Sequence, residues 1–264
     1  MPESREMERT IALFIDFENV AEGAKEAGFQ EFEIELVVQR LLDKGKIVFK
    51  RAYADWGRFA DFKRSLHGAA VEMVDIPRRR MSGKNSADIR MVVDALDLCY
   101  SKQHINTFAL VSGDSDFSPL VSKLRENDKY VIGIGAKKSS SELLVANCDE
   151  FVFYEDLMRE KKKEVKVSGV GVGKEQSEAL EIVMETIKAL ARENPDEIHS
   201  SMVKDTIKRK RPQFDEGYHG YSSFTKLLED VARRGLIEIE KSPKSGTYVV
   251  KSFNEGAWQS QKGT

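Results

Sequence analysis

The chain has 264 residues, of which 41% are hydrophobic and 33% charged, and its formal net charge is -2. This length suits two domains, and the composition is typical of a globular protein rather than a uniformly basic nucleic-acid-binding protein. No run approaches the roughly 20 apolar residues that cross a bilayer, and the polar N-terminus shows no secretory signal, so we expect a cytoplasmic protein without membrane contact. Cys99 and Cys148 are too few, and too isolated from histidine, for a zinc site, and they predict reduced thiols.

Up to residue 154, predicted strands alternate with predicted helices. Residues 10–15 (TIALFI) form a continuous apolar run, as in a strand buried on both faces. Further strands are predicted at residues 47–54, 71–76, 107–111, 130–134 and 151–154, and helices at residues 32–44, 57–67, 86–100, 117–126 and 140–146. The alternation predicts an α/β fold whose mostly parallel sheet has helices on both faces.

The pattern changes in the second part of the chain. Residues 158–176 are charged and then alternate glycine with valine, which predicts a linker. Beyond it, helices are predicted at residues 177–192, 201–210 and 223–234, and short strands at residues 236–240 and 247–251. Three helices and a β-hairpin predict a small winged helix-turn-helix domain over residues 177–252, followed by a flexible tail at residues 253–264.

Aspartates follow the predicted strands at the edge where open α/β sheets bind ligands. Asp16 follows residues 10–15, Asp114 and Asp116 follow residues 107–111, and Asp88 begins the helix between them. Asp88 also suits the positive end of a helix dipole, and Asp116 also suits the N-cap of the helix that begins at residue 117. Asp16 is harder to explain in this way, because an unpaired charge at the end of a buried strand costs several kcal/mol.

Asp16, Asp88 and Asp114 together favour a hard divalent cation, Mg²⁺ or Mn²⁺, held by carboxylates and water. Such an ion activates water for attack on a phosphodiester. The pattern therefore predicts Asp16, Asp88 and Asp114 as catalytic and metal-binding residues.

A basic loop between a predicted strand and a predicted helix faces the same edge. Its cations are predicted to hold the phosphates of the substrate, and they are Arg78, Arg79, Arg80 and Lys84.

Other α/β metal sites fit the sequence less well. A haloacid-dehalogenase-type phosphatase needs Asp-x-Asp after the first strand, where this chain has Asp16-Phe17-Glu18. Neither a Walker loop nor a GxGxxG motif is present in the sequence. A Toprim-like site could combine Glu18 with Asp114, but it would leave Asp88 unused.

Three motifs carry a resemblance to a known family. IALFIDFENV, KNSADIRMVVDAL and FALVSGDSDFSPLVSKLRENDKYVIGIG occur in this order and closely resemble the NYN domain, in the LabA-like branch of the PIN-like nucleases. The resemblance implies a PIN-like, Rossmann-like domain over residues 1–157, a Mg²⁺ or Mn²⁺ site and RNA cleavage. It implies Asp16, Asp88 and Asp114 as metal-binding residues, Asp116 as a fourth acid, Asn19 in support of the first motif, and Ser112 orienting the metal or a phosphate.

The C-terminal part carries a second resemblance. FDEGYHGYSSFTKLLEDVARRGLIEIE is similar to an OST-HTH/LOTUS domain, a type of domain that binds RNA or docks proteins. Basic and aromatic residues there are predicted to contact phosphates and to stack on bases, and they are Lys208, Arg209, Lys210, Arg211 and Tyr221. The alternative for Tyr221 is packing in the small core.

The sequence thus predicts a metal-dependent ribonuclease that acts on single-stranded RNA and carries a C-terminal RNA-binding or protein-docking module. One alternative is a non-catalytic RNA-binding adaptor with a vestigial acidic site. Another is a nuclease acting on DNA or on structured nucleic acid, since carboxylate metal sites do not themselves recognise the 2′-hydroxyl. A homodimer is compatible with the sequence.

Overall fold

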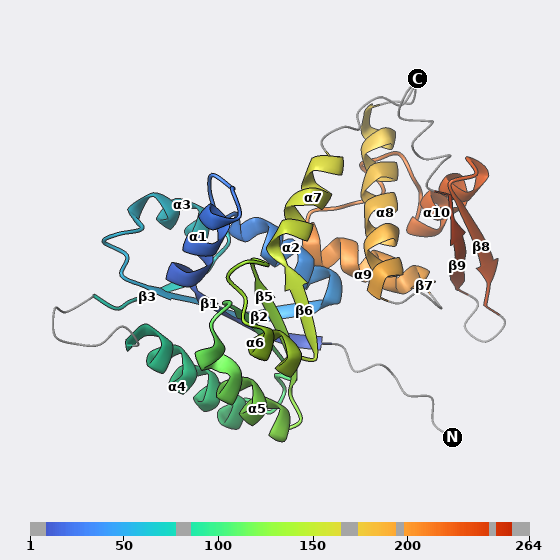
Figure 1. Cartoon of the computed structure of the whole chain (residues 1–264). Coiled ribbons are helices and arrows are strands. Elements are labelled where there is room, and N and C mark those ends of the chain that lie inside the picture. The colour runs from blue at the N-terminus through green and yellow to red at the C-terminus, as the bar shows by residue number, and fades with distance from the viewer. Residues whose placement is uncertain (1–8, 78–85, 165–173, 194–197, 243–246, 255–264) are drawn as a thin grey trace. The chain divides into compact units, whose positions relative to one another are not determined.

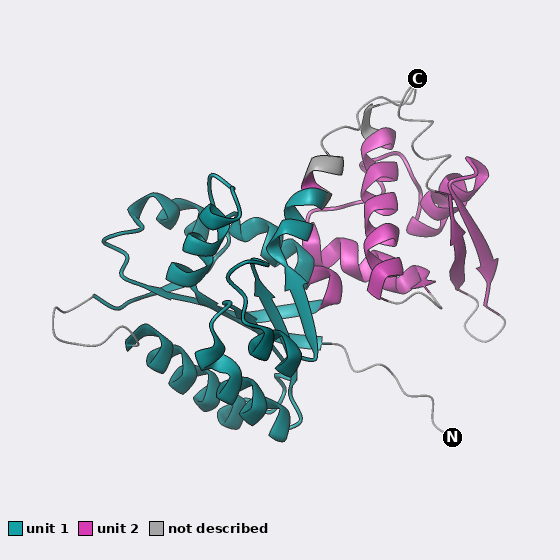
Figure 2. Cartoon of the chain, in the orientation of Figure 1, with its two compact units in different colours: residues 1–41, 45–160 teal, residues 42–44, 161–264 magenta. Residues whose placement is uncertain are grey.

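The computed structural model describes residues 9–77, 86–164, 174–193, 198–242 and 247–254. The chain divides into two compact units, residues 1–41 with 45–160 and residues 42–44 with 161–264 (Figure 2). Within the described residues, no helix combines the length and the apolar character needed to cross a membrane.

The first unit is built on a six-stranded sheet in which all neighbouring strands are parallel (Figure 1). Its order is β3-β2-β1-β4-β5-β6, so the chain reverses its direction of winding between β1 and β4. Such a reversal is the usual ligand-binding position in open α/β sheets. The strands are β1 (Arg9–Asp16), β2 (Gly45–Ala54), β3 (Glu72–Asp75), β4 (Thr107–Val111), β5 (Tyr130–Gly135) and β6 (Glu150–Phe153).

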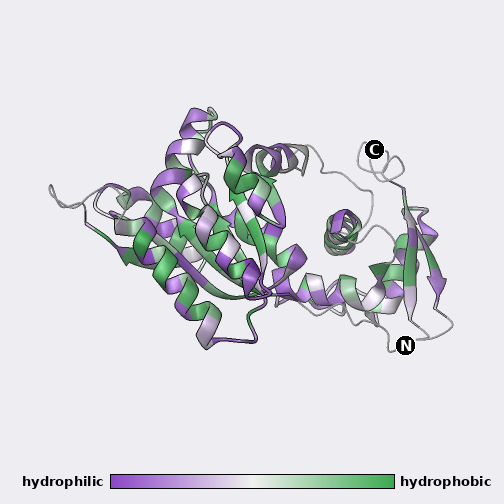
Figure 3. Cartoon of the chain, turned by 60° about the horizontal axis from the view of Figure 1, so that its bottom comes forward, coloured by the Kyte–Doolittle hydropathy of each residue, from purple (hydrophilic) through white to green (hydrophobic). Residues whose placement is uncertain are grey.

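Strand β1 separates two hydrophobic cores. Ile11, Leu13 and Ile15 point into one core, while Ala12 and Phe14 point into the other. The first core is covered by α1 (Phe17–Glu26), α2 (Ile34–Lys44), α3 (Lys63–Gly68) and α7 (Tyr154–Glu164). The second is covered by α4 (Ser86–Ser101), α5 (Ser118–Glu126) and α6 (Glu142–Asn147). Hydrophobic residues follow the strands and the adjoining helix sides (Figure 3), which confirms the predicted α/β fold.

Helix α1 was not predicted, although it begins directly after Asp16. Its buried positions include Phe17, Val20, Ala21 and Ala24, which have helical spacing. Two of these four are alanines, so the apolar stripe is weak in the sequence. The predicted helix at residues 57–67 is also shorter in the structure, with a 3₁₀ turn η1 (Ala60–Phe62) before α3.

The predicted linker at residues 158–176 is wrong at both ends. Helix α7 continues through residue 164, and α8 (Lys174–Glu193) begins before residue 177. The segment MREKKKE has no long apolar stripe, but lysine, arginine and glutamate have high helix propensity. Leu157 of α7 is buried in the first core, so packing holds the start of the helix.

The second unit has three helices and a three-stranded antiparallel sheet of order β7-β9-β8. Its elements are α8, β7 (Ile198–His199), α9 (Ser200–Lys210), α10 (Phe224–Arg233), β8 (Ile237–Lys241) and β9 (Tyr248–Phe253). Strand β7 was not predicted because two residues carry no detectable period. The three helices and the hairpin agree with the predicted winged helix-turn-helix.

Candidate active site

Strands β1 and β4, between which the winding direction of the chain reverses, bring Asp16 and Ser112 to the same edge of the sheet. Ile15 of β1 is in register with Val111 of β4, so Asp16 and Ser112 are the next residues on two neighbouring strands. The Ser112 hydroxyl donates to Asp16 Oδ2 at 3.0 Å and accepts the backbone N–H of Asp114 at 3.2 Å. Ser112 therefore connects two of the predicted metal-binding residues.

Asn19 ties the first turn of α1 to the end of β4. Its backbone N–H donates to Asp16 Oδ1 at 3.4 Å, and its side-chain Oδ1 accepts the N–H of Gly113 at 2.8 Å. Asn19 thus supports the first motif. Ser112 is fully buried and its hydroxyl donates to Asp16, so it orients this predicted metal-binding residue and does not itself contact a phosphate.

Asp114 and Asp116 have different roles. Asp114 is the N-cap of the 3₁₀ turn η2 (Ser115–Phe117), and its Oδ1 accepts the N–H of Asp116 at 2.9 Å. The prediction that Asp116 caps the following helix is wrong, because a 3₁₀ turn precedes α5 and moves the free N–H groups back to Asp114. The side chain of Asp116 is exposed.

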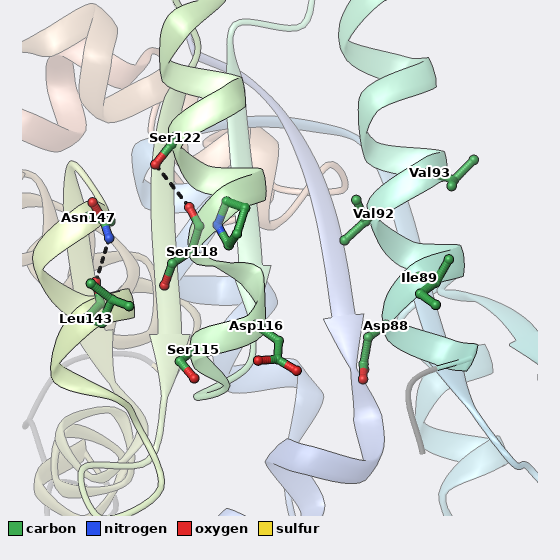
Figure 4. A pocket seen from close by; sticks show the side chains of 11 residues that line it. Asp88, Ile89, Val92, Val93, Ser115, Asp116, Ser118, Ser122, Leu143 and Asn147 are labelled. Atoms are coloured by element: carbon green, nitrogen blue, oxygen red, sulfur yellow. Dashed lines mark hydrogen bonds between the residues drawn. The ribbon is translucent and has the colours of Figure 1, made fainter. Parts of the chain in front are cut away.

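Asp88 lies in the first turn of α4, across from Asp116. The two carboxylates line the same end of one pocket (Figure 4). Burial raises the pKa of Asp16 from its ordinary value of 3.8 to about 7, and the negative charge of Asp88 adds to the rise, with a smaller addition from Asp114. The hydrogen bonds from Ser112 and Asn19 oppose this rise. Asp88 and Asp114 are therefore each close enough to Asp16 to repel its negative charge.

A half-buried polar cluster joins α4 to β2, and sequence reasoning missed it. Asp94 of α4 accepts the Tyr53 hydroxyl at 2.9 Å and pairs with Arg51 at 2.8 Å, and both partners are on β2. Asp94 lies one turn after the buried Met91, on the side of the helix that faces the sheet. A charged residue within an otherwise apolar helix face was the signal in the sequence.

Tyr53→Phe is expected to lower the free energy of unfolding by about 1 kcal/mol, because the carboxylate of Asp94 loses a hydrogen-bond donor. It is also expected to lower activity on nucleic acid, because α4 carries Asp88 and small displacements of a catalytic group are costly. Urea unfolding and steady-state cleavage measure the two effects. Tyr100→Phe, which removes the hydroxyl of an exposed tyrosine on the same helix, is the control and should change neither quantity.

The acidic edge has the chemistry of a hard-cation site. In the part of the chain that the structure describes, neither Asp16 nor Asp114 forms an ion pair with lysine or arginine. Carboxylate oxygens are the donors that Mg²⁺ and Mn²⁺ prefer. Among the described residues, no three histidine, cysteine, aspartate or glutamate side chains gather closely enough to hold one ion between them. The donor set therefore fits an ion that one or two carboxylates and water molecules hold.

Two further sets of residues were considered from the sequence, and the structure describes one of them. Arg78, Arg79, Arg80 and Lys84 lie outside the described residues. Glu18 accepts the N–H of Asp55 at 3.2 Å and pairs with Arg58 at 3.0 Å, on the β2 side of β1. Asp114 follows β4 on the other side of β1, so the Toprim-like arrangement is not formed.

Tyr221 does not present its ring for RNA stacking, and that prediction is wrong. The side chain is packed in the core of the second unit, and its hydroxyl donates to Asp230 Oδ2 at 2.9 Å. Core packing, the alternative stated from the sequence, describes Tyr221. The neighbouring Tyr218 is the exposed aromatic residue of this segment, with 67% of its surface accessible.

The basic run Lys208 to Arg211 lies at the end of α9, next to the negative end of the helix dipole. The ammonium group of Lys208 donates to the backbone oxygen of Phe214, and Arg209 donates to the Thr206 hydroxyl at 2.8 Å. These two side chains stabilise the helix end. Lys210 and Arg211 are the last basic residues of the run.

Comparisons with known proteins agree with both units. Residues 10–155 match the NYN domain, and residues 178–249 match the OST-HTH/LOTUS domain. An uncharacterized protein of Methanocaldococcus jannaschii is 31% identical over 185 residues, which cover 66% of this chain and 71% of that protein. A crystal structure of a protein of unknown function from Vibrio parahaemolyticus matches with a TM-score of 0.51 and 26% identity, over 58% of this chain and 96% of that chain.

NYN domains are generally nucleases, and OST-HTH domains are associated with RNA binding. The matched segments therefore give the first unit a nuclease-like fold and the second unit the character of a nucleic-acid-binding domain. The chain belongs to the NYN domain family and carries an OST-HTH/LOTUS domain after its NYN domain.

Proposed function

We propose that this protein is a metal-dependent ribonuclease that hydrolyses single-stranded RNA in its NYN domain and retains the RNA through its OST-HTH domain. One observation carries the proposal. Asp16 and Asp114 lie at the reversal of the sheet, where Ser112 links them, and the charge of Asp88 is close enough to raise the pKa of Asp16.

Each acidic residue has a role in this proposal. Asp16, Asp88 and Asp114 would hold Mg²⁺ or Mn²⁺, at most two of them directly and the rest through bound water, and Asp116 would contribute as a fourth acid. The bound cation supplies positive charge that acidifies water and neutralises the phosphate. Ser112 and Asn19 hold the two oxygens of Asp16 in place, so this carboxylate keeps one orientation. Asp116 is exposed and lies two residues after Asp114, and in this proposal it would accept a proton from the attacking water.

The test is cleavage of a labelled single-stranded RNA with Mn²⁺. Asp114→Asn is expected to lower the rate by about 10²-fold or more, because it removes charge that the transition state requires. EDTA should abolish cleavage by the wild type. Asp61→Asn, which neutralises an exposed aspartate outside the site, is the matched control and should cleave at the wild-type rate. Equal rates for the wild type and Asp114→Asn would contradict the proposal.

The absence of three closely gathered metal-binding side chains among the described residues favours a second candidate, a non-catalytic RNA-binding adaptor. The same experiment separates the two functions. An adaptor binds RNA equally well with and without EDTA and leaves the strand intact. A 2′-deoxy strand of the same sequence, added in parallel, shows whether the substrate is RNA or DNA.

A further inference from the structure

An open groove begins at the acidic edge and lies between three helices of the NYN domain. The groove has a volume of about 710 Å³, within the range of roughly 300–1,000 Å³ that is usual for small-molecule sites. Asp88 and Asp116 lie at one end of it (Figure 4). Helices α4 and α6 form its walls and α5 forms its floor. We call this the α4–α6 groove.

The walls of the α4–α6 groove are apolar side chains in contact with solvent. Ile89 and Val93 project from α4 and Leu143 projects from α6, with 63%, 55% and 58% of their surfaces exposed. These three are half of the six large hydrophobic residues that are exposed in the described chain. Apolar side chains gathered along one groove are typical of a binding surface.

The floor carries a buried hydroxyl group without a partner. Ser118, at the start of α5, is 5% exposed, and its Oγ makes no hydrogen bond within the described residues. A buried polar group without a partner is costly, so a ligand that offers a hydrogen bond there is favoured. Figure 4 shows Ser118 on the groove side of α5, toward Leu143.

Charge decides which part of a nucleotide fits. Among the described residues that line the α4–α6 groove, the charged ones are Asp88 and Asp116 at its end, and none is basic. A phosphate in the groove would therefore be repelled, whereas a neutral base with its apolar faces would be accepted. Bases stack on flat or apolar surfaces largely independently of sequence.

Resting on the proposed function, we infer that the α4–α6 groove binds a nucleobase of single-stranded RNA next to the bond that is cleaved. The base would lie between the walls formed by Val93 and Leu143, with a polar edge toward Ser118. Its phosphate would stay outside the groove, at the acidic edge, where the cation of the proposed function would offset the negative charge of the aspartates. The groove is continuous with the acidic edge, which favours this occupant over a partner protein.

Photocrosslinking tests the location of the base without requiring cleavage. RNA containing 4-thiouridine is irradiated with the full chain carrying Asp114→Asn, and tryptic peptides are mapped. Crosslinks are expected in peptides 85–90, 91–102, 103–123 and 139–159, which contain the groove residues. Val93→Ala with Leu143→Ala should lower the yield in these peptides about tenfold, because a base loses its stacking surface.

Val48→Ala is the matched control, because it truncates an exposed valine on β2 outside the groove, and it should change the yield less than twofold. Crosslinks confined to other peptides, or an unchanged yield in the double variant, would overturn the inference. The inference would also be overturned if the wild type sedimented as a dimer and the double variant as a monomer, because the groove would then hold a second copy of the chain. Crosslinks at the groove in a chain that cleaves no RNA would support the inference while the proposed function fails.

Discussion

Replacing Asp16 by asparagine is expected to stabilise the NYN domain against unfolding at pH 8 while removing its activity. Asp16 is 7% exposed, and burial is the main cause that raises its pKa to about 7. Above that pH the folded protein holds a buried negative charge next to Asp88 and Asp114. Asparagine has nearly the same shape and carries no charge.

The direction of the pH dependence follows from proton linkage. Between pH 3.8 and about 7 the folded state binds more protons at Asp16 than the unfolded state, so this residue's contribution to stability falls as the pH rises. The difference corresponds to roughly 4 kcal/mol at its largest. The amide must also rearrange its hydrogen bond with Ser112, so we expect a net gain of about 1–3 kcal/mol for Asp16→Asn at pH 8.

Urea unfolding at pH 5, 6, 7 and 8 in EDTA measures this difference. Trp56 is buried in the NYN domain, and a Trp258→Phe background makes it the single tryptophan, so fluorescence reports on this domain. The gain should shrink as the pH falls from 8 to 5. If the wild type and Asp16→Asn differed in free energy of unfolding by the same amount at all four pH values, the raised pKa of Asp16 would be contradicted. In a separate series at pH 8 without EDTA, Mn²⁺ should raise the free energy of unfolding of the wild type and leave that of Asp16→Asn unchanged.

Gly113→Ala is expected to disrupt the acidic edge through backbone contact. A Cβ atom on Gly113 would lie 2.2 Å from the carbonyl oxygen of Ser139 and 2.9 Å from the Cα of Ser140. The Gly113 carbonyl also accepts the N–H of Ser141 at 2.8 Å, so the two segments cannot separate without losing this bond. We expect a loss of about 1–3 kcal/mol in stability.

The loss of activity in Gly113→Ala should be larger than the loss of stability implies. Gly113 lies between Ser112 and Asp114, so a displaced backbone moves Asp114 away from Asp16. Gly68→Ala is the control, because nothing lies within 4 Å of the added atom, at the end of α3. It should unfold at the wild-type urea concentration or slightly above it. Wild-type cleavage by Gly113→Ala would show that this contact does not position the acids.

The strands and the acids that follow them could be predicted from the sequence. The apolar runs at residues 10–15 and 107–111 are strands in the structure. Asp16 is the last residue of the first strand, and Asp114 follows the second strand after Ser112 and Gly113. A strand buried on both faces is a local property of the chain, so hydrophobicity and length reveal it. The weak stripe of α1 and the charged helix α7 were missed, because their residues lack a long apolar face.

The tertiary structure alone decided which side chains meet. Strand order places Ser112 beside Asp16, across 96 positions of sequence, and turns it from a proposed phosphate ligand into a link between two acids. The small core of the second unit takes up Tyr221, which the sequence alone left open between stacking and packing. The α4–α6 groove joins helices that are far apart in the chain. Local patterns determine which elements form, whereas contacts between remote segments depend on strand order and packing, which no local pattern contains.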